Sequence, residues 1–267
     1  MNWNLVRKTL IDRWKFIAAY AAAMSAWVLM LAAIFPSFQN IKGIEDVFQS
    51  YPESLTRLFG IEKIDISSFD NLMSMELYGL MIVIIVSTFI IAFARSMVAG
   101  EIQEGTIDLL LAQPIQRWKV LTSEGAVLFG GTVAITGATV LSVYAFGAAF
   151  GIEVSYSGHA AFMLLAIALF AAIAGYSVLL SAVMREPRRV AMAAAGLTLV
   201  FYLVHFAAGY NSVVEKVDWF SIFHYYDPMK VVLSGAVPAR DIFILLAFAA
   251  VFFSAALALF QRRDIAV

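Results

Sequence analysis

The sequence predicts an all-α integral membrane protein with six transmembrane helices. Its composition, six long apolar segments and the placement of its basic residues all favour this fold. Of the 267 residues, 62% are hydrophobic and only 14% are charged, and the mean hydropathy is +0.86. A soluble globular protein carries about 25% charged residues. A chain this apolar therefore needs lipid over part of its surface.

Six segments are long enough to cross a bilayer, which takes about 20 apolar residues as a helix. The segments cover residues 16–36, 74–94, 120–150, 160–184, 190–209 and 242–261. The first is longer than the 7–15 residues of a signal-peptide core, so we interpret it as an uncleaved span. No soluble domain is left between the spans, and residues 1–267 are expected to form a single transmembrane domain.

The basic residues predict the orientation. With the N-terminus inside, 12 of the 18 Lys and Arg residues fall in cytoplasmic segments and six fall outside. Cytoplasmic loops of membrane proteins carry such an excess. We therefore expect a multi-pass protein of the cell membrane with both termini in the cytoplasm.

Several kinds of chemistry are excluded or disfavoured by what the sequence lacks. The absence of cysteine excludes disulfides and thiolate metal sites. A net charge of −1 gives no indication of a nucleic-acid partner. No GxxxxGK[ST] phosphate loop occurs, so any ATP would have to be hydrolysed by another chain. We predict no catalytic residues and no enzyme activity.

The three histidines show no metal-ligand spacing, and we predict no metal site. His159 and His224 fall in outside gaps, where solvated surface histidines are expected. His205 lies within the fifth span, and an ionisable group there is a functional candidate by default. We expect a neutral imidazole that is hydrogen-bonded to a neighbouring helix, with a transport role as the alternative. Glu76, at the start of the second span, is treated in the same way, as an interface residue first and a gate second.

Four further features complete the pattern. Residues 44–59 have the spacing of an amphipathic surface helix, lying either on the membrane or on the protein itself. The aromatic gap 210–241 predicts a re-entrant hairpin or an aromatic belt. Glu124 is expected to cap the start of the third span. Small residues in the third and fourth spans, such as Gly130, Gly131, Gly137 and Gly175, permit close helix packing, within one chain or between two.

The segment between the second and third spans is the most informative. Glu101, Glu104 and Asp108 are spaced at i, i+3 and i+7, so one helical face would be acidic. Pro114 ends the pattern and can open the next helix. These residues predict a short cytoplasmic helix between two spans, on which a partner could push. A solvated acidic face that docks onto a partner is favoured over a metal site.

The same segment resembles the coupling-helix signature of type-2 ABC transporter permeases. The residues that carry the resemblance are Gly100, Glu101, Gly105, Thr106, Leu110, Leu111, Pro114 and Arg117. The outside stretch YPESLTRLFGI, at residues 51–61, and the basic pair Arg262-Arg263 also resemble this family.

The resemblance implies a half-transporter, in a family that consists mostly of exporters. It would pair with a second copy or with a homologous permease, and it would bind one ATP-binding subunit through residues 100–117. The chain itself would hold no cofactor, and ATP with magnesium would bind the partner subunit. The alternative is an ATP-independent channel or a regulatory membrane subunit, although the spans lack the polar residues of a channel. The substrate is not evident, although apolar spans favour an amphipathic or hydrophobic cargo.

Overall fold

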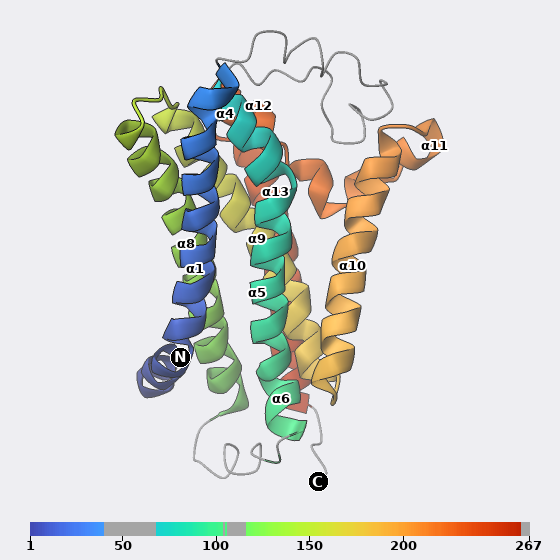
Figure 1. Ribbon diagram of the computed structural model, residues 1–267. Coiled ribbons are helices and arrows are strands. Elements are labelled where there is room, and N and C mark those ends of the chain that lie inside the picture. Colours follow the sequence, from blue (N-terminus) through green and yellow to red (C-terminus); the bar gives the residue numbers. More distant parts are fainter. Residues whose placement is uncertain (40–67, 104, 106–115, 263–267) are drawn as a thin grey trace.

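The computed structural model describes residues 1–39, 68–103, 105 and 116–262, and this part of the chain is all-helical (Figure 1). The long helices are α1 (Trp3–Gln39), α5 (Ile82–Ser96), α8 (Arg117–Ala149), α9 (Tyr156–Val183), α10 (Pro187–Ala208) and α13 (Ala239–Arg262). The short helices are α4 (Phe69–Leu72), η1 (Met73–Met81), α6 (Val98–Gln103), α11 (Ser212–Glu215), η2 (Asp218–Phe220), η3 (Ile222–Tyr225) and α12 (Pro228–Ser234).

In the described part of the chain, six helical stretches are long and apolar enough to cross a membrane, and each overlaps one predicted span. The second stretch joins α4, η1 and α5 into one rod, in which η1 is π-helical. The largest difference from the prediction is at the start, because α1 begins at Trp3 rather than near residue 16. Charged residues lower the hydropathy of 3–15, but Arg and Lys are good helix formers. The prediction of a six-span helical membrane protein is confirmed.

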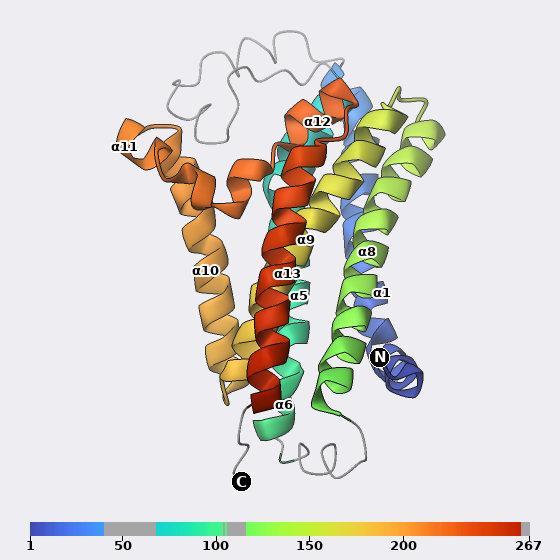
Figure 2. The same ribbon diagram turned by 180° about the vertical axis from the view of Figure 1, so that it is seen from behind.

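Helix α9 forms the centre of the bundle. It packs against α13, α5, α8, α12 and α10, whereas α1 packs mainly along α8. Figure 2 shows α13 lying along α9 on the side opposite to the view of Figure 1. In the most apolar part of α9, 67% of the residues are buried, compared with 11% in that of α13. Most apolar side chains of α13 are therefore at least partly exposed, and lipid would cover them.

Glycines set two of the closest helix contacts. A Cβ on Gly175 would lie 2.9 Å from the backbone oxygen of Ala249, so α9 and α13 meet almost backbone to backbone. A Cβ on Gly158 would lie much closer still to the carbonyl oxygen of Val232 in α12. In contrast, a Cβ on Gly130 would have no neighbour within 4 Å. The small residues of the fourth span therefore serve packing within one chain.

The bundle has two distinct ends (Figure 1). The α6 end carries α6, the first turns of α1 and α8, the turn between α9 and α10, and the last turn of α13. The α12 end carries α4, α11, η2, η3 and α12. The N-terminus of α1 and the C-terminus of α13 thus lie at the same end, as an even number of spans requires.

The aromatic gap 210–241 is folded into α11, η2, η3 and α12 before α13 begins. Trp219 and Phe220 are exposed, whereas Phe223 and Tyr226 are buried. The aromatic residues of this gap thus divide between the surface and the core. The predicted amphipathic helix 44–59 and the stretch at 51–61 lie outside the described residues.

Candidate functional site

The segment that was predicted to couple to a partner begins with α6. This helix follows α5 after a break at Met97, whose ψ of −98° is not helical. The backbone N–H of Ala99 donates to Ser181 Oγ in α9 at 3.3 Å. Val98, Ala99 and Gly100 are buried, whereas Glu101 is half-buried. Helix α6 is therefore fixed to two spans, with its acidic residue at the edge of the protein.

Gly105 ends this local structure. Its φ of +69° lies in the left-handed region, which glycine adopts without cost, and its N–H donates to the Ile102 carbonyl at 3.3 Å. The left-handed Gly105 lies within the helix that was expected to carry Glu101, Glu104 and Asp108 on one face, and the arrangement of these carboxylates stays a prediction. Glu104, Thr106, Asp108 and Pro114 lie outside the described residues. Arg117 is the first residue of α8.

A polar pocket of about 210 Å³ lies beside α6. It joins residues from four helices, and its charged lining residues are Lys8, Asp12, Arg13, Glu101 and Glu124. The Arg13 guanidinium donates to Ser96 Oγ at 2.8 Å and lies 5.4 Å from the centre of the Phe93 ring. The backbone N–H of Asn2 donates to Ser123 Oγ in α8 at 2.9 Å. The first turns of α1 thus connect α5 to α8 next to Glu101.

Two of these positions differ from the sequence predictions. Glu124 lies two turns into α8, which begins at Arg117, so it does not cap the helix start as predicted. Instead it lines the same pocket as Glu101. The polar face of α1 was not predicted as part of a site. A signal was present, because Lys8, Asp12 and Arg13 recur at helical spacing.

At the α12 end, His159 is wholly buried rather than solvated, which corrects the surface prediction. Its Nε2 lies 3.0 Å from Asp70 Oδ1, and its Nδ1 lies 3.0 Å from the Tyr78 hydroxyl. Because an ionised carboxylate only accepts, Nε2–H donates to Asp70, and in the neutral ring Nδ1 accepts from Tyr78. The Tyr226 hydroxyl donates to the Tyr78 carbonyl at 2.7 Å. Burial raises the pKa of Tyr226 well above its usual value, so this hydroxyl stays protonated.

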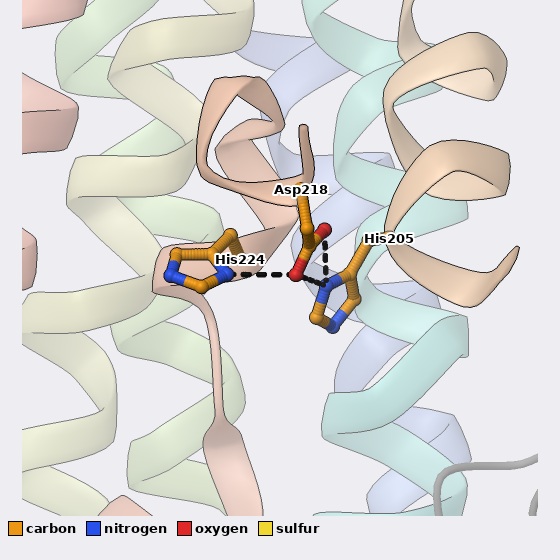
Figure 3. Close-up of side chains that lie close together, drawn as sticks. All are labelled: His205, Asp218 and His224. Atoms are coloured by element: carbon orange, nitrogen blue, oxygen red, sulfur yellow. Dashed lines mark hydrogen bonds and ion pairs between the residues drawn. The ribbon is translucent and has the colours of Figure 1, made fainter. Parts of the chain in front are cut away.

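His205 and His224 also have partners at this end. Both present Nδ1 to the carboxylate of Asp218, at 3.1 Å and 2.7 Å (Figure 3). His205 belongs to α10, whereas Asp218 and His224 belong to the η2–η3 segment. His205 is thus hydrogen-bonded to a neighbouring element, as expected, but its partner is a carboxylate. His224 is 44% exposed and therefore only partly matches the expected solvated histidine. Glu76 lies half-buried in η1.

Two hollows lie elsewhere on the bundle. A cavity of about 640 Å³ at the α12 end is lined by residues from η1, α10, η2, η3 and α12, including His205, Asp218 and His224. A groove of about 340 Å³ runs between α8, α9 and α13, and it is almost entirely apolar, with Phe129 and Phe253 in its lining. Neither hollow was predicted, because each is assembled from helices far apart in sequence.

The fold defines the class of protein. Six apolar helices that are long enough to cross a membrane are the architecture of a multi-pass membrane protein. A family model described as "ABC-2 family transporter protein" matches residues 19–265. The chain therefore belongs to the ABC-2 family of transporter membrane proteins and is an ABC transporter permease. No curated protein matches the chain in a sequence search.

Proposed function

We propose that this chain is the membrane-spanning subunit of an ATP-driven exporter in the cell membrane. Two permease chains, identical or homologous, would pair to form the substrate path, and each would bind a separate ATP-binding subunit. The α6 end would face the cytoplasm. Such permeases normally hold no ATPase site, and this sequence has no phosphate loop.

The position of α6 is the observation that carries this proposal. It continues from α5, donates a hydrogen bond to α9 through Ala99, and shares a polar pocket with α1 and α8. A force applied to residues 100–117 would therefore act on four spans together. The apolar groove between α8 and α13 supports an amphipathic or hydrophobic cargo, because a polar cargo would find few partners there.

The coupling role is tested by Glu101→Ala, made in a chain that is co-expressed with its ATP-binding subunit. A carboxylate that accepts charge-assisted hydrogen bonds forms strong contacts, and truncating one partner of a desolvated pair costs on the order of 2–5 kcal/mol. We expect weaker co-purification, or ATP hydrolysis that is no longer linked to transport. Glu186→Ala is the matched control, because Glu186 is an exposed carboxylate at the same end whose pair with Arg189 is solvent-exposed.

Substitutions at Gly105 distinguish two requirements, which are a left-handed backbone at this residue and the close approach of a partner. Asparagine tolerates a positive φ and leucine does not, and the structure leaves open space around a Cβ at this position. If a partner approaches closely here, both Gly105→Asn and Gly105→Leu should weaken co-purification. If only the left-handed turn matters, Asn should be accepted. Normal coupling in Glu101→Ala and in both Gly105 variants would contradict the proposal and favour a channel or regulatory subunit.

The purified chain without its partner should bind no nucleotide. Its sequence has no phosphate loop, so the ATP site is assigned to the other subunit. Titration with a fluorescent ATP analogue and Mg²⁺ should show no saturable binding. Stoichiometric binding by the chain alone would contradict the proposal that the ATP site lies on another subunit.

A further inference from the structure

We propose that His205, Asp218 and His224 form a binding site for a divalent transition-metal ion, for which Zn²⁺ is the best match. This site lies at the α12 end and does not depend on the coupling role of α6. It joins two imidazole nitrogens and one carboxylate, the ligand types that Zn²⁺ binds most often besides thiolate. The three residues lie at positions 205, 218 and 224, and the helix end and turns between them bring the side chains together (Figure 3).

The distances are close to those that an ion needs. One ligand atom from each residue can be chosen so that all three lie within 4.8 Å of one another. In a tetrahedral site with metal–donor distances of about 2.0–2.1 Å, neighbouring donor atoms lie about 3.3–3.4 Å apart. The contacts of Asp218 with His205 Nδ1, at 3.1 Å, and with His224 Nδ1, at 2.7 Å, would have to widen by less than about 1 Å. A pair of donors at the 4.8 Å limit would have to close by about 1.4 Å. Both imidazoles are about two-fifths exposed and can make this movement.

The surroundings favour a cation. The carboxylate of Asp218 is only 10% exposed and receives both Nδ1 atoms, so it is held in place between them. The adjoining cavity also includes Glu215 and Asp227 in its lining. Among the described residues, this lining contains no lysine or arginine. An ion held by three protein ligands would keep a fourth position open toward the cavity, where water or another donor could bind.

The same contacts could instead be two plain histidine–carboxylate hydrogen bonds, in which each Nδ1–H donates to Asp218. A metal ion would bond to the two Nδ1 atoms in place of these protons, and each neutral imidazole would then carry its proton on Nε2. It would then tie the end of α10 to the η2–η3 segment that leads into α12. The two interpretations differ in one measurable property, which is whether the chain binds Zn²⁺ stoichiometrically.

The test uses the full chain in detergent, purified through a tag without histidine and stripped of metal by a chelator. Zn²⁺ is titrated against a chromophoric chelator of known affinity. We expect one ion per chain in the wild type. Removing one ligand, by Asp218→Asn or His224→Gln, should weaken binding by at least about 100-fold, because even outer-shell partners of a metal cost about 10–100-fold. Excess Mg²⁺ should not compete, since it prefers oxygen ligands.

Asp227→Asn is the matched control. It removes a carboxylate from the same cavity, and an asparagine oxygen can still accept the Lys230 N–H that Asp227 now caps. Zn²⁺ binding should weaken far less in this variant than in the ligand variants, because Asp227 is not one of the three ligands. His224→Gln, at an exposed position, keeps the test independent of folding. The site is overturned if the wild type binds no ion. Equal binding in wild type and His224→Gln, or an equal loss in Asp227→Asn, would also overturn it.

Discussion

At the α12 end, Asp70, His159 and Tyr78 form one buried hydrogen-bonded series, whereas at the α6 end the charged side chains surround a small polar pocket. The first arrangement joins α4, η1 and α9 and is further connected to Tyr226. In the second, charged lining residues such as Lys8 and Glu101 are partly or fully exposed, whereas Phe93 and Met97 in the same lining are buried. Breaking a buried polar contact leaves groups unsatisfied, but a solvated one is replaced by water. We therefore expect the buried series to be more rigid than the polar pocket at the α6 end, where water can replace the contacts.

The comparison depends on which end of the bundle faces the cytoplasm. Cysteine labelling tests this orientation and should give the largest effect. The chain contains no cysteine, so single cysteines report cleanly. In intact cells, a membrane-impermeant maleimide should label Val237→Cys, at the α12 end, and not Arg185→Cys, in the turn between α9 and α10. After permeabilisation both should react. Both side chains are exposed. Labelling of Arg185→Cys alone in intact cells would invert the proposed orientation.

Gly158→Ala should be the most destabilising small change. A Cβ there would collide with the Val232 backbone, so α9 and α12 would have to separate. Overpacking typically costs about 1–3 kcal/mol, and we expect the upper part of that range because backbone cannot rotate away. Thermal unfolding in detergent measures the effect. Gly130→Ala is the matched control, because its Cβ meets nothing and should be neutral or slightly stabilising. Equal losses in both variants would contradict the tight α9–α12 contact.

Asp70→Ala tests the buried series directly. It leaves the Nε2–H of His159 and the backbone N–H of Ser155 without their acceptor. An unsatisfied buried donor costs about 1–3 kcal/mol. Asp12→Ala removes an exposed carboxylate from the α6 end and should change stability by no more than about 0.5 kcal/mol. If the two variants lose equal stability, the two ends do not differ in the way described.

These positions also show what the sequence could predict. Six spans were predictable because each is a continuous apolar run, and lipid imposes helical structure on it. The burial of His159 was not, since its partner Asp70 lies 89 residues away and no local spacing reports such a pair. The His205–Asp218–His224 cluster would have been easier to predict, because its three residues lie close together in the sequence. Its geometry depends on turns that hydropathy does not describe. The role of Gly100–Arg117 rests on resemblance, and it stays a prediction.

Arg13→Gln should cost less stability than Asp70→Ala, and its main effect should be on coupling. The side chain is half-buried, donates to Ser96 Oγ at 2.8 Å and stacks near Phe93. A hydrogen bond of this kind contributes about 0.5–1.5 kcal/mol, and water can take its place at the rim of the pocket. We therefore expect a stability loss of about 1 kcal/mol in thermal unfolding.

The coupling of ATP hydrolysis to transport in Arg13→Gln distinguishes the two ends better than the stability of this variant does. Arg13 connects α1 to the end of α5, one residue before the break that leads into α6. Loosening this contact should reduce the transport obtained per ATP hydrolysed by the complex. Lys15→Gln removes an equal charge from an exposed position on the same helix and should leave both quantities unchanged. A stability loss as large as that of Asp70→Ala, with normal coupling, would mean that the α6 end is a rigid structural element. Its contacts would then not be exchangeable, and the contrast between the two ends would fail.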